Sequence, residues 1–129
     1  MDYGKRSVGL ACCDETGIAV RPLASIPNLG SRKLLAQLRR IAEEGRIDAL
    51  VVGLPLNMDG STGELALEAR HFMQALESAL RLPVIPVDER LSTVEAEQLW
   101  KGMGLRQRRK YRSADSLAAA LILRRHLEE

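Results

Sequence analysis

The chain has 129 residues, enough for one domain with an ordinary hydrophobic core and too few for two. Apolar residues make up 46% of the sequence and aromatic residues only 3%, which favours an aliphatic core and argues against an aromatic platform that stacks single-stranded bases. The net charge is +2, no apolar run approaches the roughly 18 residues of a membrane span, and no signal peptide opens the chain, so we expect a soluble cytoplasmic protein.

The first elements that the sequence predicts are the two strands of a β-hairpin. Val8–Cys13 and Ile18–Leu23 are strand-like apolar runs, and turn-forming residues at Asp14–Gly17 separate them. Cys12 and Cys13 are adjacent, with no other cysteine in the chain and no spacing for zinc. We therefore interpret both as small buried apolar residues in a reducing compartment.

Strands and helices are predicted to alternate through the middle of the chain. A helix with Ser31 as its N-cap and Gly45 at its end carries apolar residues at helical spacing. Ala49–Val52 is a short apolar strand that runs into the loop 53–61, and a second apolar helical stripe extends from Leu65 to Leu80. The next strand is expected over residues 83–87.

Two helices joined by a basic loop are predicted for the last third of the chain. Ser92–Glu95 has the pattern of a capping box, Gly102 and Gly104 end that helix, and the final helix runs from Ser113 to about Leu127. Strands that alternate with helices imply a parallel section of sheet, to which the opening hairpin adds antiparallel strands. The sequence therefore predicts a single mixed α/β domain.

The basic loop gives the chain an uneven charge. Residues 101–129 contain eight Lys and Arg against three Asp and Glu, a net of +5, whereas residues 1–100 have a net of −3. This asymmetry indicates a polyanionic partner that approaches from one side, and a solvated helix surface is the alternative. The candidate phosphate contacts are Arg106, Arg108, Arg109, Lys110 and Arg112.

Three acidic residues occupy positions where chemistry can occur. Asp88 and Glu89 stand at the end of a predicted strand, where α/β sheets bind their ligands, and a solvated turn is the alternative. Side chains alternate along a strand, so only one of the two should face the crevice. Asp115 lies in the first turn of an apolar helix, where the helix dipole alone would also favour a carboxylate.

Acids beside a basic segment are the arrangement that metal-dependent phosphodiester hydrolysis requires. Two Mg²⁺ ions about 3.5–4 Å apart stabilise the attacking and leaving oxygens. Hard cations prefer carboxylate oxygens, so a few acids from different elements are enough. Neither His71 nor His126 has a setting that favours a Ser/His or Cys/His nucleophile.

Taken together, these stretches resemble the YqgF family of pre-16S rRNA nucleases, also described as Holliday-junction resolvase-like proteins. The resemblance covers nearly the whole chain in family order. It is carried by Asp2-Tyr3-Gly4 followed by Val8-Gly9-Leu10-Ala11, by Val51 to Gly60, by Val87 to Ala96, and by Asp115-Ser116 with the Ala-rich helix.

The resemblance implies an RNase H-like fold with a mixed five-stranded sheet flanked by helices. It also implies a site that binds Mg²⁺ or Mn²⁺ through Asp2, Glu89 and Asp115, with Asp88 as a weaker fourth ligand. The implied activity is maturation of the 5′ end of pre-16S rRNA in ribosome biogenesis, with cleavage of branched DNA as the older proposal. Asn57 joins the basic residues as a nucleic-acid contact, and the protein would be a monomer or a homodimer.

One departure from the family concerns the first strand. In the family an apolar run precedes Asp-Tyr-Gly and forms most of a central strand, whereas here Asp2 follows Met1 directly. We expect this truncated strand to leave neighbouring backbone groups unpaired, which costs about 1–3 kcal/mol of stability for each buried group. Unless the true start lies upstream of Met1, we expect the activity of this protein to be impaired.

Two other functions remain as alternatives. A non-catalytic RNA-binding factor could use the same fold and the basic segment. A sugar-kinase or actin-like ATPase shares an acid-x-Gly loop, but it needs two large domains to enclose ATP.

Overall fold

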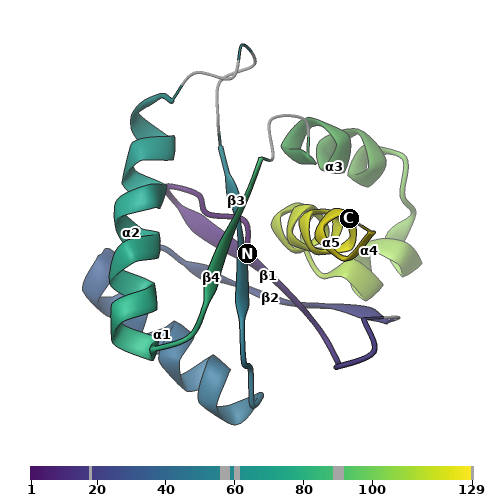
Figure 1. Cartoon of the computed structure of the whole chain (residues 1–129). Coiled ribbons are helices and arrows are strands. Elements are labelled where there is room, and N and C mark those ends of the chain that lie inside the picture. The colour runs from purple at the N-terminus through teal and green to yellow at the C-terminus, as the bar shows by residue number, and fades with distance from the viewer. Residues whose placement is uncertain (18, 56–58, 60–61, 89–91, 129) are drawn as a thin grey trace.

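The computed structural model of the chain describes residues 1–17, 19–55, 59, 62–88 and 92–128 (Figure 1). Its elements, in order, are β1 (Ser7–Cys13), β2 (Val20–Pro27), α1 (Ser31–Glu44), β3 (Leu50–Leu54), α2 (Glu64–Leu80), β4 (Val84–Asp88), α3 (Ser92–Lys101), α4 (Leu105–Tyr111) and α5 (Ala114–Glu128). The α/β class and the hairpin are confirmed. The loop predicted after Gly104 is wrong, because its basic residues form the short helix α4.

The strands form two small sheets in place of the one five-stranded sheet that was expected. Within the described residues, β1 pairs with β2 antiparallel, and β3 pairs with β4 parallel. The segment Met1–Asp2 lies between these pairs, and Asp2 forms an antiparallel bridge with Gly9 of β1 and a parallel bridge with Gly53 of β3. Within the described residues this segment makes isolated bridges instead of a continuous ladder, so the two strand pairs are joined only through these bridges.

Two predicted element starts needed correction. β2 begins at Val20 and continues to Pro27, beyond the expected run that ended at Leu23. Ser31 is the first residue of α1 and not its cap: Gly30 holds the N-cap position with φ 104, a backbone angle that favours glycine, and no side chain caps the helix there. Gly45 is the C-cap, as predicted.

One hydrophobic core lies between the strands and the helices α1 and α2, on the left of Figure 1. It takes alternate residues of the strands, which is the pattern expected when one sheet face is covered. Its strand residues are Val8, Leu10, Val52 and Leu54, with Leu34 and Leu38 from α1 and Phe72, Met73 and Leu76 from α2.

The opposite face is covered by α5, with α3 and α4 beside it (Figure 1). Ala118, Ala119 and Ala120 are buried, and their small side chains let α5 approach β1 closely. Ser113 caps this helix, because its hydroxyl accepts a hydrogen bond from the Ser116 amide at 3.0 Å. The α5 face is therefore a close-packed layer fixed at its N-terminal end.

In the part of the chain that the structure describes, no helix is both long and apolar enough to cross a membrane.

Candidate functional site

Asp2 is directed to the α5 face by its neighbours. The side chains of Met1 and Tyr3 are buried in the core on the α1/α2 side. The Tyr3 ring packs against Phe72 in a tilted arrangement with ring centroids 5.5 Å apart, and its hydroxyl donates to Glu68 Oε2 at 3.2 Å. Burial raises the pKa of Tyr3. Because side chains alternate along an extended segment, Asp2 between them points to the other face, where it is half-buried.

Gly9 brings Asp115 to the same place. Asp2 and Gly9 exchange backbone hydrogen bonds at 2.9 and 3.0 Å, so their side-chain directions share a face. A Cβ atom built on Gly9 would lie 1.9 Å from the carbonyl oxygen of Asp115. The first turn of α5 therefore rests directly on the strand position opposite Asp2, so Asp2 and the turn that carries Asp115 lie on the same face.

The Asp115 carboxylate has a partner that the sequence did not reveal. The Ser7 hydroxyl donates a hydrogen bond to Asp115 Oδ2. The turn that carries Asp115 is itself anchored, because the buried Ser116 hydroxyl donates to the Leu23 carbonyl at 2.5 Å. The Asp115 carboxylate is thus held by β1, and the turn that carries it is held by β2.

The structure does not place the other predicted site residues beside Asp2 and Asp115. Asp88 pairs in register with Leu54, whose side chain lies in the core, so Asp88 belongs to the α1/α2 face and is exposed. Glu89 and Asn57 lie outside the described residues. Within the residues that are described, no group of three His, Cys, Asp or Glu side chains is placed to hold a metal ion.

Two basic residues that sequence reasoning passed over lie between Asp2 and Ser7. Lys5 and Arg6 are exposed on a loop that Asn28 anchors: its side chain donates to the Gly4 carbonyl at 2.8 Å, and its backbone amide donates to the Arg6 carbonyl at 2.9 Å. The adjacent bases after Asp-Tyr-Gly were the available signal. They place positive charge on the loop that connects Asp2 to Ser7, the partner of Asp115.

The basic residues of the C-terminal region divide into two groups. Arg108 is half-buried: its Nε and Nη2 donate to the Trp100 carbonyl at 3.1 and 2.9 Å, and the guanidinium lies 5.0 Å from the Trp100 ring centroid. This side chain ties α4 to the end of α3. The others are exposed and available to phosphate: Arg106, Arg109, Lys110 and Arg112.

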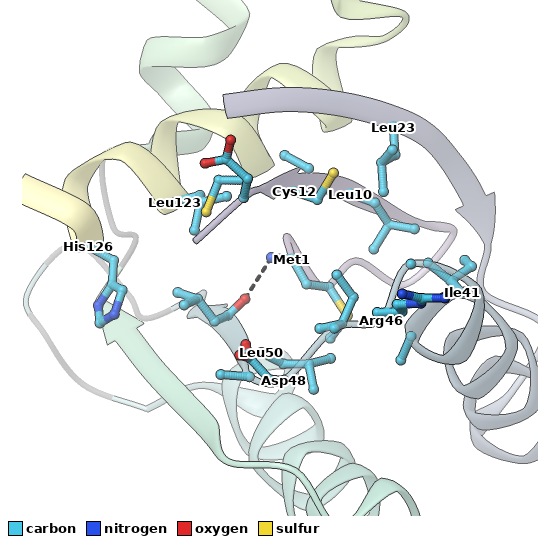
Figure 2. A pocket seen from close by; sticks show the side chains of 18 of the residues that line it. Met1, Leu10, Cys12, Leu23, Ile41, Arg46, Asp48, Leu50, Leu123 and His126 are labelled. Atoms are coloured by element: carbon cyan, nitrogen blue, oxygen red, sulfur yellow. Dashed lines mark hydrogen bonds between the residues drawn. The ribbon is translucent and has the colours of Figure 1, made fainter. Parts of the chain in front are cut away.

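A cavity of about 670 Å³ lies on the other side of Met1 (Figure 2). The Met1 amino group donates to the Val51 carbonyl at 2.7 Å, and apolar side chains such as Leu10, Ile41 and Leu123 line the space around it. Neither Asp2 nor Asp115 lines this cavity. It is therefore separate from the paired acids.

The two cysteines, which were expected to be buried, line this cavity. Cys12 and Cys13 are free thiols and half-buried, so they are less enclosed than expected. Burial and the nearby charge of Asp14 raise the pKa of Cys13, so its thiol stays protonated at neutral pH.

Comparison with known proteins gives consistent matches. Residues 1–129 match the family described as "RuvX: Holliday junction resolvase". A protein of Synechococcus sp. is 41% identical over 129 residues, which is 100% of this chain and 87% of the relative. A protein of Lachnospira eligens is 38% identical over 131 residues (99% and 94%), and one of Thermosynechococcus vestitus is 36% identical over 128 (99% and 85%). Each carries the name "Putative pre-16S rRNA nuclease".

Proposed function

The chain belongs to the RuvX family of Holliday junction resolvases, and from this membership we propose that it is a divalent-metal-dependent nuclease that processes the 5′ end of pre-16S rRNA. The names of its relatives support this substrate. The observation that supports the proposal is that Asp2 and the helical turn carrying Asp115 both lie at Gly9, on the face covered by α5. Carboxylates that share a face repel each other, and a bound cation would offset that repulsion.

Asp2, Glu89 and Asp115 are the residues that would hold Mg²⁺ or Mn²⁺. Their donor atoms fit the group, since hard divalent cations take carboxylate oxygens and keep several waters. Two such ions, when bound, stabilise the attacking and leaving oxygens of an in-line phosphodiester displacement. The chain's own contribution is to fix the direction of the acids, through Gly9 beneath Asp115 and through the buried neighbours of Asp2.

Substrate contacts are assigned to the exposed bases. Lys5 and Arg6 follow Asp2 on the anchored loop, and they would contact phosphates close to the acids. Arg106, Arg109, Lys110 and Arg112 would position the flanking backbone without reading its sequence, and Asn57 keeps its proposed role as a nucleic-acid contact. The guanidinium of Arg108 is engaged with Trp100, so it contributes charge but is not assigned a direct contact.

Branched DNA is the second candidate substrate, because the family description names Holliday junctions. Both substrates are phosphodiesters in structured nucleic acid, and the acid site suits either. A non-catalytic RNA-binding role is the third outcome that the test must separate.

The test incubates the purified chain with a pre-16S rRNA fragment carrying its 5′ flank, and separately with a four-way DNA junction. We expect Mg²⁺- or Mn²⁺-dependent cleavage of the RNA that EDTA abolishes. Asp115→Asn keeps the shape of the side chain but removes a charge, and it should slow cleavage by roughly 100-fold or more while nucleic-acid binding persists.

Asp48→Asn is the matched control, because Asp48 is an exposed aspartate at the cavity and away from the paired acids. It should cleave like the wild type. Preferential cleavage of the junction would make the DNA the substrate. Binding without cleavage in either metal, by the chain and also by a form with a completed first strand, would leave the RNA-binding role. Cleavage that survives both EDTA and Asp115→Asn would remove the proposed site.

A further inference from the structure

Ser7 and Asp115 form a contact between the first residue of β1 and the first turn of α5. The two residues are 108 positions apart, and the Ser7 hydroxyl donates to Asp115 Oδ2. Both side chains are half-buried. Ser7 and Gly9 are two positions apart on one strand, so Ser7 shares the face on which Asp2 and Asp115 meet.

This hydrogen bond restricts a carboxylate that could otherwise turn. The side chain of an aspartate has a broad, roughly two-fold preference about its last torsion, so helix packing alone does not select which oxygen faces the site. An ionised carboxylate only accepts hydrogen bonds, and a hydroxyl that donates to Oδ2 selects one orientation. Oδ1 is then left for another partner on the same face.

The role differs from that of the other groups around Asp115. Gly9 and Ser116 fix where the backbone of the helix lies, through close packing and through the bond to the Leu23 carbonyl. Among the residues that the structure describes, Ser7 alone hydrogen-bonds the carboxylate itself. Hydrogen bonds behind a metal-binding side chain orient it, and their loss weakens metal binding.

We propose that Ser7 is a positioning residue that orients the Asp115 carboxylate for a divalent cation, an inference that rests on the proposed nuclease function. Ser7 itself touches neither the cation nor the substrate. Its effect reaches the reaction only through Asp115.

The test measures Mn²⁺ affinity of the full-length protein by calorimetry, without nucleic acid, for the wild type, Ser7→Ala and Ser7→Thr. Ser7→Ala should weaken Mn²⁺ binding by about tenfold. Ser7→Thr retains the hydroxyl and should restore it. In cleavage assays Ser7→Ala should lower kcat at limiting Mn²⁺, recover with excess Mn²⁺, and leave KM for the RNA unchanged.

A double-mutant cycle with Asp115→Asn separates positioning from a general structural role. If Ser7 acts through the Asp115 carboxylate, Ser7→Ala should change the residual Mn²⁺ affinity of Asp115→Asn by less than about twofold. The same tenfold loss in that background, or wild-type Mn²⁺ affinity in Ser7→Ala, would overturn the Ser7 proposal and leave the nuclease standing. A wild-type chain that neither binds Mn²⁺ nor cleaves would overturn both.

Discussion

Gly9 determines at the level of a single residue whether the two ends of the chain can share a site. It forms a hydrogen-bonded pair with Asp2 on one side, and its missing side chain admits the backbone of Asp115 above. Glycine is needed here for space and not for an unusual backbone angle, because Gly9 does not have a positive φ. Any larger residue must push α5 away from β1.

We expect Gly9→Ala to lower the free energy of unfolding by about 1–3 kcal/mol, since a Cβ would lie 1.9 Å from a backbone oxygen that cannot rotate away. Metal affinity should fall as well, because Asp115 moves with the helix. Urea unfolding and Mn²⁺ calorimetry would measure the two effects. Gly102→Ala is the matched control: the added methyl would meet only ordinary contacts, the nearest at 3.7 Å, and stability should hardly change.

At the scale of elements, one arginine of α4 fixes the position of this helix against the end of α3. The Arg108 guanidinium bonds the Trp100 carbonyl near the end of α3 and lies over the Trp100 ring. A second tie joins α3 to α5 through the ion pair of Glu95 with Arg125. These contacts give the exposed bases of α4 a fixed position relative to Asp115.

Arg108→Ala and Arg109→Ala should therefore have different effects, although both remove one positive charge. Loss of Arg108 should destabilise the fold by about 1–2 kcal/mol, because it removes two charge-assisted hydrogen bonds and a ring contact. Arg109 is exposed, so its loss should leave stability unchanged and reduce the salt dependence of nucleic-acid binding by about one unit. Equal melting temperatures for the two variants would contradict the structural role of Arg108.

For the whole molecule, the interrupted sheet leaves a space that an extended segment would fill. The Gly9 backbone faces Asp2, and alternate residues of a strand face the same way, so Ala11 and Cys13 direct backbone groups toward the cavity beside Met1. Val51 of β3 lines the cavity from the other side, and its carbonyl accepts a hydrogen bond from the Met1 amino group. Apolar side chains line both faces of this space, which suits a strand buried on both sides.

Joining about four Val and Ile residues ahead of Met1 should therefore stabilise the protein, because each would pair its backbone and bury its side chain. We expect the melting temperature to rise by roughly 5 °C or more. An extension of the same length made of Gly and Ser is the control, and it should raise the melting temperature only slightly. An equal rise with both extensions would show that the cavity does not accept a strand.

The sequence predicted those features that depend on local pattern. The apolar run before Gly53, the turn at Asp14–Gly17 and the helical stripe of α2 each carry their periodicity within a few residues, and the structure confirms them. The helix α4 was missed because seven mostly basic residues show no apolar repeat. The Ser7 to Asp115 bond could not be foreseen, because it depends on how closely α5 approaches β1.

The two isolated bridges of Asp2 also have a mechanical consequence. α5 packs mainly on the hairpin, α2 packs on β3 and β4, and Asp2 bridges β1 and β3 between the two strand pairs. Asp115 rests on Gly9 of β1 and Asp2 bridges both strand pairs, whereas Glu89 follows β4 in the sequence. A cation bound by all three carboxylates would link the two strand pairs to each other. Metal binding and folding would then be thermodynamically coupled. Any change that stabilises the contact between the two strand pairs would therefore also raise the affinity for the cation.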